Sequence, residues 1–88
     1  MNEYTFDALI RDLSDQREIE FTLDGQRYFA TPDLPINRIN EDDLYYGVLD
    51  VDSKLWIFQG TIQELIEFRF NNSSFLGNFD DFRFQYIL

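Results

Sequence analysis

Residues 18–25, with the sequence EIEFTLDG, decide how this chain folds. Apolar residues occupy the odd positions from 19 to 23 and polar residues the even ones, which is the period of a strand with one buried face. Asp24-Gly25 follows directly, and this dipeptide tolerates the positive φ values of a type I′ turn. We therefore expect Gln26–Thr31 to fold back as the antiparallel partner in a tight hairpin.

A second hairpin is predicted further along the chain. Prolines interrupt residues 32–43, which are expected to form a loop with one helical turn around residues 36–39. Leu44–Leu49 and Lys54–Gln59 then have the composition of two strands joined by a polar turn. Alternation in the second strand places Leu55 and Ile57 on one face and Trp56 and Phe58 on the other, while Tyr45 and Tyr46 point opposite ways.

Helical signals lie on both sides of these hairpins. Thr5 is placed as the N-cap of a helix whose apolar stripe leaves Asp12 in solvent. Thr61-Ile62-Gln63-Glu64 is a capping box and predicts a helix to about Phe70, although residues 66–70 also alternate like a strand. A short helical turn near residues 75–79 and a final strand over residues 82–86 complete the prediction. The stripe of the first helix consists of Phe6, Leu9, Ile10 and Leu13.

The order α-β-β-β-β-α-β predicts an α+β fold, with an antiparallel sheet of four to five strands and two helices on one face. The 88 residues suffice for a single domain with one core. Two helices of roughly ten residues can cover one face of a small sheet, and they cannot cover both. We therefore expect apolar groups on the second face to remain in contact with water.

Composition excludes several classes of function. Lysine and arginine number 7 against 17 acids, which gives a net charge of −10 and disfavours direct binding to nucleic acid or to an anionic membrane. Histidine and cysteine are absent, so nucleophilic Ser-His or Cys-His pairs, disulfides and the usual zinc ligands are excluded. No apolar run approaches the roughly 20 residues of a membrane span, and the start Met1-Asn2-Glu3 lacks the charge of a signal peptide. We expect a cytoplasmic protein that is not an enzyme and needs no cofactor.

One pattern points to metal-dependent catalysis instead. Pro32-Asp33, followed by Asp52-Ser53-Lys54, resembles the PD-(D/E)xK pattern of divalent-metal nucleases. In that pattern two acids hold the ion and lysine steadies the attacking water or the phosphate. The resemblance would assign Asp33, Asp52 and Lys54 to a nuclease-like site, which stands as the alternative to a binding function.

The favoured function is a protein–protein interaction. An exposed apolar patch bordered by charge is typical of protein-binding sites, and tryptophan and tyrosine are common anchors in them. With this net charge, the expected partner is a basic protein, whose approach the carboxylates would steer. The predicted contact residues are the aromatic anchors Tyr45, Tyr46, Trp56 and Phe58 and the acids Glu18, Glu20, Asp42, Asp43, Asp50 and Asp52.

The acids also favour a narrower hypothesis. Carboxylates on one face of a strand recur about every 6.6 Å, close to the axial rise of two successive phosphates in one DNA strand. Glu18 and Glu20, together with loop acids such as Asp24, Asp80 and Asp81, are thus spaced to imitate a nucleic-acid backbone. The partner would then be a protein that binds DNA or RNA.

A local resemblance agrees with that hypothesis. Residues 12–21, DLSDQREIEF, followed by Asp24-Gly25 and Tyr28, are similar to the opening of small proteins of Gram-positive bacteria and their mobile elements. In size, acidity and lack of cysteine the chain resembles small phage and prophage proteins, among them DNA mimics and the anti-CRISPR proteins that block RNA-guided nucleases. The resemblance implies a protein that acts by occupying a partner's nucleic-acid surface.

The apolar surface need not bind a different protein. The loops over residues 32–43 and 71–74 can fold over the second face of the sheet. Alternatively, the face is the subunit contact of a homo-oligomer, because self-association is another simple way to bury it. Both possibilities stay open at the level of sequence.

Overall fold

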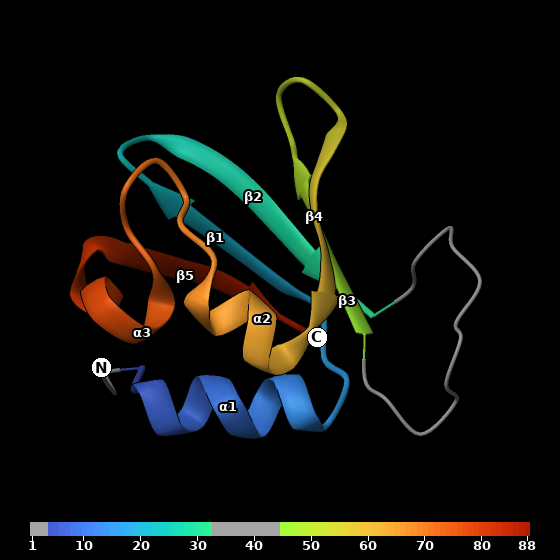
Figure 1. Cartoon of the computed structure of the whole chain (residues 1–88), viewed down its shortest axis with the longest axis vertical. Helices are drawn as coiled ribbons and strands as arrows, with labels where there is room; N and C mark the ends of the chain where they lie inside the picture. Colours follow the sequence, from blue (N-terminus) through green and yellow to red (C-terminus); the bar gives the residue numbers. More distant parts are fainter. Residues whose placement is uncertain (1–3, 33–44) are drawn as a thin grey trace.

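A computed structural model describes residues 4–32 and 45–88 of the chain. Within these residues, five strands form one antiparallel sheet in the order β4-β3-β2-β1-β5 (Figure 1). The predicted α+β class is confirmed, and the helical turn expected around residues 36–39 lies outside the described residues. The strands are β1 (Ile19–Leu23), β2 (Gln26–Thr31), β3 (Tyr45–Asp50), β4 (Leu55–Thr61) and β5 (Phe82–Ile87).

The helices gather on one face of this sheet. They are α1 (Phe6–Ser14), α2 (Ile62–Glu67), the short α3 (Phe75–Asn78) and the 3₁₀ turn η1 (Phe79–Asp81). Figure 1 shows α1, α2 and α3 on the same side of the strands. One face of the sheet is therefore covered by helices, as the order of elements predicted.

Helix α1 begins where its cap was expected. The side chain of Thr5 accepts a hydrogen bond from the backbone N–H of Ala8 at 3.1 Å, which satisfies one unpaired donor of the first turn. Leu9 and Leu13 are buried against the sheet, while Phe6 and Ile10 are partly buried beside them. The apolar stripe read from the sequence is thus the packing face of the helix.

Asp12 is not in solvent, which corrects the sequence prediction. Its residue is only 6% exposed, and its carboxylate accepts a hydrogen bond from the hydroxyl of Tyr4 at 2.6 Å. The guanidinium groups of Arg17 and Arg11 lie 3.6 and 3.9 Å from the same carboxylate. Because a buried carboxylate needs such partners, Asp12 fixes the segments on either side of α1 instead of contributing to an acidic surface.

The first hairpin has the predicted turn. Asp24 and Gly25 adopt φ values of 51° and 82°, as a type I′ turn requires. The hairpin register places Phe21 opposite Tyr28, and their rings stack with centroids 5.4 Å apart. On its other side β1 pairs with β5. Strand β1 therefore lies inside the sheet, with a neighbour on each side.

The capping box between β4 and α2 is confirmed in both halves. The backbone N–H of Glu64 donates to the Thr61 hydroxyl at 3.1 Å, and the N–H of Thr61 donates to the Glu64 carboxylate at 2.8 Å. Strand β4 was expected to end at Gln59 and instead continues to Thr61, which is at once its last residue and the helix cap. No linker separates the strand from the helix.

Helix α2 ends at Glu67, before the predicted end at Phe70. Phe68 already has extended backbone angles, and Asn71 and Asn72 turn the chain back with φ values of 51° and 80°. Phe70 pairs with Ser73 across this turn and is only 2% exposed. The early end of the helix thus lets Phe70 enter the core.

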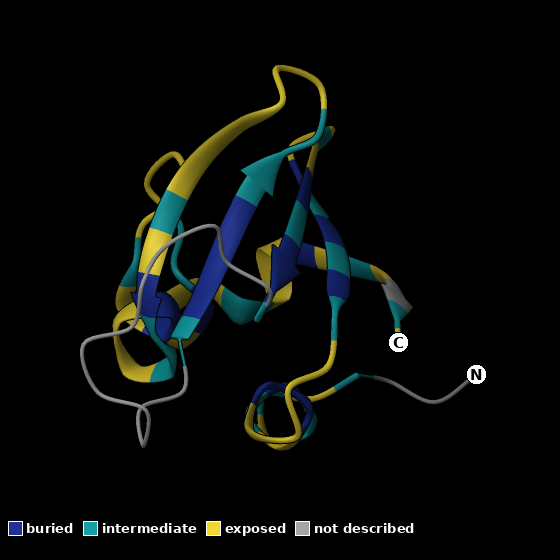
Figure 2. Ribbon diagram, turned by 90° about the vertical axis from the view of Figure 1, so that its right-hand side faces the viewer, coloured by how far each residue is buried: buried dark blue, intermediate teal, exposed yellow. Residues whose placement is uncertain are grey.

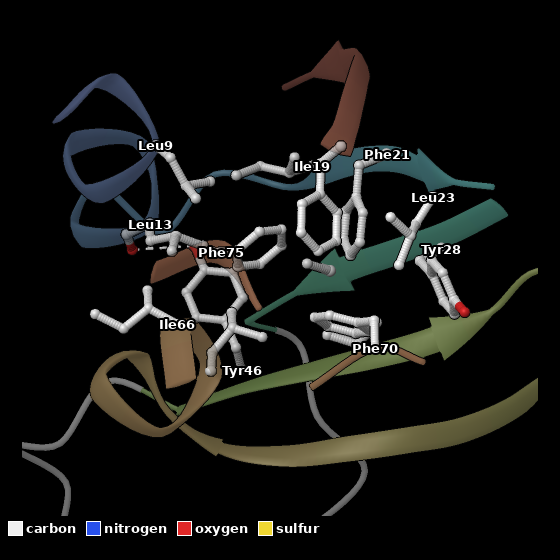
Figure 3. Close-up of a cluster of buried hydrophobic side chains, with 14 residues drawn as sticks. Leu9, Leu13, Ile19, Phe21, Leu23, Tyr28, Tyr46, Ile66, Phe70 and Phe75 are labelled. Carbon is white, nitrogen blue, oxygen red and sulfur yellow. Dashed lines mark hydrogen bonds between the residues drawn. The ribbon is translucent and has the colours of Figure 1, made fainter. Parts of the chain in front are cut away.

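The core lies between the sheet and the helices and is rich in aromatic rings (Figure 3). Phe21 is fully buried at its centre, with ring centroids of neighbouring aromatic residues between 5.1 and 5.9 Å away. Edge-to-face contacts at such distances add stability beyond the burial of area alone. The neighbours of Phe21 are Tyr28, Phe70, Phe75, Phe82 and Phe84.

Candidate functional site

The face of the sheet opposite the helices carries a row of four cross-strand neighbours. Glu20 of β1 pairs with Phe29 of β2, Phe29 with Leu49 of β3, and Leu49 with Trp56 of β4. Because directly paired residues share a face, these four side chains lie side by side across the sheet. Glu20, Phe29 and Leu49 are half-buried, Trp56 is exposed, and none belongs to the core. We call Glu20, Phe29, Leu49 and Trp56 the outer row.

Strand β4, at one end of the outer row, is the most exposed apolar element of the described chain. Leu55, Trp56 and Ile57 are 64, 39 and 36% exposed, respectively. In Figure 2, β4 descends from the β3–β4 turn mostly in the colour of exposed residues, beside a largely buried β3. Exposed apolar side chains are thus concentrated on β4, but of the three only Trp56 pairs into the outer row, since Leu55 pairs with Asp50 on the face of the core residue Tyr28.

A β-bulge changes which aromatic residues share a face. Val48 pairs with Phe58 and Leu49 with Trp56, so Ile57 is an extra residue in β4. Trp56 therefore lies on the outer face, while Phe58 lies on the helix-covered face, where its ring contacts Phe68 at 5.1 Å. The prediction that Trp56 and Phe58 share a face is wrong, and Phe58 is part of the core packing instead of an exposed anchor.

Tyr45 and Tyr46 point to opposite faces, as predicted, and only one of them remains a candidate contact residue. Tyr46 is 0% exposed, and its hydroxyl lies 3.0 Å from the carbonyl oxygen of Leu13 (Figure 3) and 2.8 Å from that of Arg17. Its prediction as a partner-binding anchor is therefore wrong, because its ring and its hydroxyl hold β3 against α1. Tyr45 is half-buried on the outer face, opposite Thr61.

Among the predicted acids, Glu18 and Glu20 lie at or beside the outer row. Glu20 is a member of it, and Glu18, just before β1, accepts a hydrogen bond from the Thr31 hydroxyl at 3.2 Å. With a strand spacing of about 4.8 Å, Glu20 on β1 and Trp56 on β4 are about 14 Å apart. One partner of ordinary size can therefore contact both. Asp42 and Asp43 lie outside the described residues.

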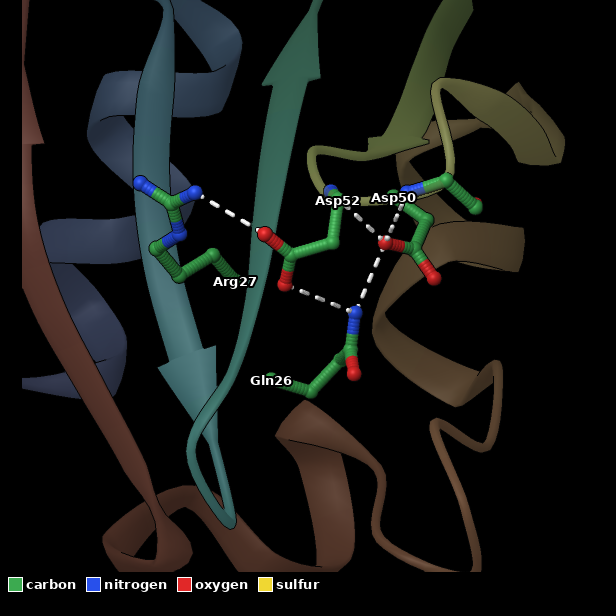
Figure 4. Close-up of polar contacts among 5 residues, drawn as sticks. Gln26, Arg27, Asp50 and Asp52 are labelled. Carbon is green, nitrogen blue, oxygen red and sulfur yellow. Dashed lines mark hydrogen bonds and ion pairs between the residues drawn. The ribbon is translucent and has the colours of Figure 1, made fainter.

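Asp50 and Asp52 have structural roles at the β3–β4 turn (Figure 4). One oxygen of Asp50 accepts hydrogen bonds from the side-chain amide of Gln26 at 2.7 Å and from the backbone N–H of Asp52 and Ser53 at 3.1 and 3.3 Å. Asp52 pairs with Arg27 at 2.9 Å, and this hydrogen bond raises the pKa of Arg27. Both carboxylates join the β3–β4 turn to β2, and both place negative charge at this end of the sheet.

The nuclease-like pattern is only half within the described residues. Asp33 lies outside them, Asp52 is engaged by Arg27, and Lys54 closes the turn with a φ value of 62°. In residues 4–32 and 45–88, no group of three or more potential metal-ligating side chains is assembled. The structure thus brings Asp52 and Lys54 into one turn and leaves their role in catalysis a hypothesis.

Sequence reasoning missed Leu49 and did not group Phe29 with Trp56. Phe29 carries a signal, because it is an apolar residue on the glutamate side of the first hairpin. Leu49 joins Phe29 and Trp56 only through the cross-strand register, which depends on the bulge at Ile57. The outer row could therefore not be assembled from alternation alone.

No helix in the described part of the chain has the length and apolar character needed to cross a membrane. Comparisons of the chain with protein-family models, with curated proteins and with solved structures give no match. The function must therefore be argued from the outer row, the exposed strand and the charge.

Proposed function

We propose that this chain is a non-catalytic binding domain for a basic protein, and that it contacts this partner through the outer row and β4. The observation that carries the proposal is the row itself, in which Phe29, Leu49 and Trp56 form an apolar band that ends at the carboxylate of Glu20. An apolar centre with a charged border is the usual composition of a protein-binding site.

The charge of the chain supports a basic partner. The net charge of −10 produces a field that attracts cationic proteins and repels nucleic acid and anionic membranes. Near the apolar band, Glu20 on β1 and Glu18 just before it provide negative charge, and so does Asp50 at the β3–β4 turn, where Asp52 is paired with Arg27. Apolar contacts would supply most of the affinity, and the carboxylates the speed and the selectivity of association.

In its narrower form, the proposal is that the partner is a nucleic-acid-binding protein whose basic surface this chain occupies. The support is the resemblance in size and acidity to phage-encoded DNA mimics and anti-CRISPR proteins, together with the closeness of Glu18, just before β1, to Glu20 on that strand. This form makes a separate prediction. Double-stranded DNA added in excess should compete with the chain for the partner.

The test is affinity capture with the immobilised chain, followed by kinetics on the captured protein. A double variant, Glu18→Gln with Glu20→Gln, tests the role of charge alone, because glutamine keeps the shape and an acceptor oxygen of glutamate and removes its charge. We expect a basic protein whose association slows as salt shortens the screening length to about 8 Å and below. The double variant should associate more slowly, with little change in dissociation.

Two results would contradict the proposal. Association that is equally fast at low and high salt and unchanged in the double variant would remove the role of the carboxylates. Capture that is unchanged by Trp56→Ser would remove the role of the apolar band. Cleavage of DNA in the presence of Mg²⁺ or Mn²⁺ would favour the nuclease-like alternative of Asp33, Asp52 and Lys54 instead.

A further inference from the structure

Strand β4 is an edge of the sheet, and its sequence lacks the charged residues and prolines that commonly protect an edge. In the order β4-β3-β2-β1-β5, β4 pairs with β3 on one side, and within the described residues no strand pairs with its other side. An edge strand presents alternate backbone N–H and C=O groups to its surroundings, and proteins usually guard such groups with charged residues or proline. The seven residues of β4, LWIFQGT, contain neither.

The opposite edge provides an internal comparison. Strand β5, FRFQYI, carries Arg83 in its first half, and a charge at this place is one of the common protections of an edge. The contrast is notable because 27% of the residues of the chain are charged. The uncharged edge of β4 therefore coincides with the exposed apolar residues Leu55, Trp56 and Ile57.

Charges at the two ends of β4 determine what can lie along it. At the turn end of β4, Asp50 and Asp52 are balanced by Arg27, which pairs with Asp52, and by Lys54, whereas at the other end Glu64 and Glu67 of α2 follow the strand. A second copy of this chain would bring two net charges of −10 together. A strand with lysine or arginine side chains would instead be attracted by the net charge and, at the α2 end of β4, by Glu64 and Glu67.

We propose that an extended, basic segment of the partner adds to the sheet as a sixth strand beside β4. This inference rests on the proposed function, and it names the way in which the partner binds. Backbone hydrogen bonds along the edge would supply affinity, alternate side chains on the outer face would contact Trp56, and cationic side chains would meet Glu64 and Glu67 at the α2 end of the strand. The bulge at Ile57 interrupts the regular edge and would fix the register of the added strand.

The test uses a synthetic peptide of about eight residues, the length of an ordinary strand, in which lysine alternates with valine. Two further versions carry N-methyl groups on alternate backbone nitrogens, one on the odd positions and the other on the even positions. All three peptides have the same side chains and the same charge. An added strand donates backbone hydrogen bonds to β4 from one edge only, so the two methylated versions should differ.

We expect the unmethylated peptide to protect backbone amides of residues 55–61 from hydrogen exchange and to reduce quenching of Trp56. One methylated version should bind at least about tenfold more weakly, because several hydrogen bonds are lost, and the other should bind within about twofold of the parent. Equal binding of all three peptides, or equal loss in both methylated versions, would overturn strand addition and leave the proposed function intact.

Other outcomes separate the remaining possibilities. Absence of binding by the lysine-valine peptide at low salt would contradict both the strand addition and the attraction of basic partners. Protection, in the dilute, monomeric protein, of those β4 amides that do not donate to β3 would show that the chain covers this edge itself and would overturn the inference. A dimer at micromolar concentration that dissociates in Trp56→Ser would identify a second copy as the occupant, which is the arrangement that the charges argue against.

Discussion

The hydroxyl of Tyr46 lies 3.0 Å from the carbonyl oxygen of Leu13, so β3 is tied to the C-terminal turn of α1. The same hydroxyl lies 2.8 Å from the carbonyl oxygen of Arg17, and one proton serves both acceptors. Carbonyl groups at the end of a helix lack partners within the helix. The carbonyl oxygen of Leu13 also accepts from the backbone N–H of Gln16 at 3.0 Å, so Tyr46 adds a second donor to the helix end from a strand that is distant in sequence.

Removal of this hydroxyl should destabilise the protein. We expect Tyr46→Phe to lower the free energy of unfolding by about 1–3 kcal/mol, because the carbonyl oxygen of Arg17 loses its hydroxyl donor and that of Leu13 keeps only a backbone donor. Urea denaturation followed by circular dichroism measures the change. Tyr28→Phe is the control, since Tyr28 is also buried but its hydroxyl forms no hydrogen bond with another described residue. Equal losses in the two variants would mean that the hydrogen bonds of Tyr46 contribute nothing specific.

Stability should also fall at alkaline pH. The pKa of Tyr46 is raised above its ordinary value of 10.0, mainly by burial and next by the negative charge of Asp12. The pKa of Tyr4 is also raised, mainly by burial and next by its hydrogen bond to Asp12. Below pH 10 both tyrosines are protonated in the folded and unfolded states, so stability does not depend on them. Above that pH the unfolded chain loses these protons first, and unfolding becomes more favourable.

The expected slope is up to about 1.4 kcal/mol per pH unit for each such tyrosine. Urea titrations between pH 8 and 11.5 should show a plateau and then a decline, and Tyr4→Phe should make the decline shallower. A free energy of unfolding that stays constant through this range would show that the tyrosines ionise equally in both states.

Asp50 should stabilise the protein through the hydrogen bonds that its oxygen accepts more than through its charge. Asp50→Ala removes the acceptor for Gln26 and for two backbone N–H groups, and we expect a loss of about 1–2 kcal/mol. Asp50→Asn keeps an oxygen that can accept the same bonds and should cost less than about 0.5 kcal/mol. If asparagine were as harmful as alanine, the charge of Asp50, and not its hydrogen bonds, would hold the turn.

Trp56 is the single tryptophan, so its fluorescence reports on β4. Because it is 39% exposed, acrylamide should quench the native protein nearly as well as the urea-unfolded chain. Trp56→Phe should change the free energy of unfolding by less than about 0.5–1 kcal/mol, as is usual for exposed positions. Strong protection of Trp56 in the free monomer would place it in a buried environment and remove it from the candidate binding face.

The elements that sequence predicted correctly are those whose signals are local. The Asp24-Gly25 turn, the Thr5 cap and the Thr61–Glu64 capping box each depend on residues within one turn of the chain. The bulge at Ile57 has no such signal, because it depends on how β4 meets β3. Because of this one extra residue, Phe58 packs against the core while Trp56 lies on the outer face.

The burial of Tyr46 and Asp12 escaped prediction for a related reason. Both are polar or amphipathic residues whose burial depends on side-chain partners that periodicity does not reveal: the carbonyl oxygens of Leu13 and Arg17 for Tyr46, and the hydroxyl of Tyr4 with two arginines for Asp12. A pattern along the chain ranks such residues as exposed. Half of the candidate site, namely Glu20 and Trp56, could be predicted from the sequence. Leu49 could be assigned to the site only from the register of the sheet.

The pairing of β1 with β5 affects how the protein is made. Roughly sixty residues separate Leu23 from Phe82, and ribosomes add about 5–20 residues per second, so β1 waits about 3–12 s for its second neighbour. During that interval the nascent sheet has unpaired edges at both β1 and β4. When β5 pairs with β1, it covers the free edge of β1 and completes the cluster of rings around Phe21. Folding can therefore be completed only after β5 has left the ribosome.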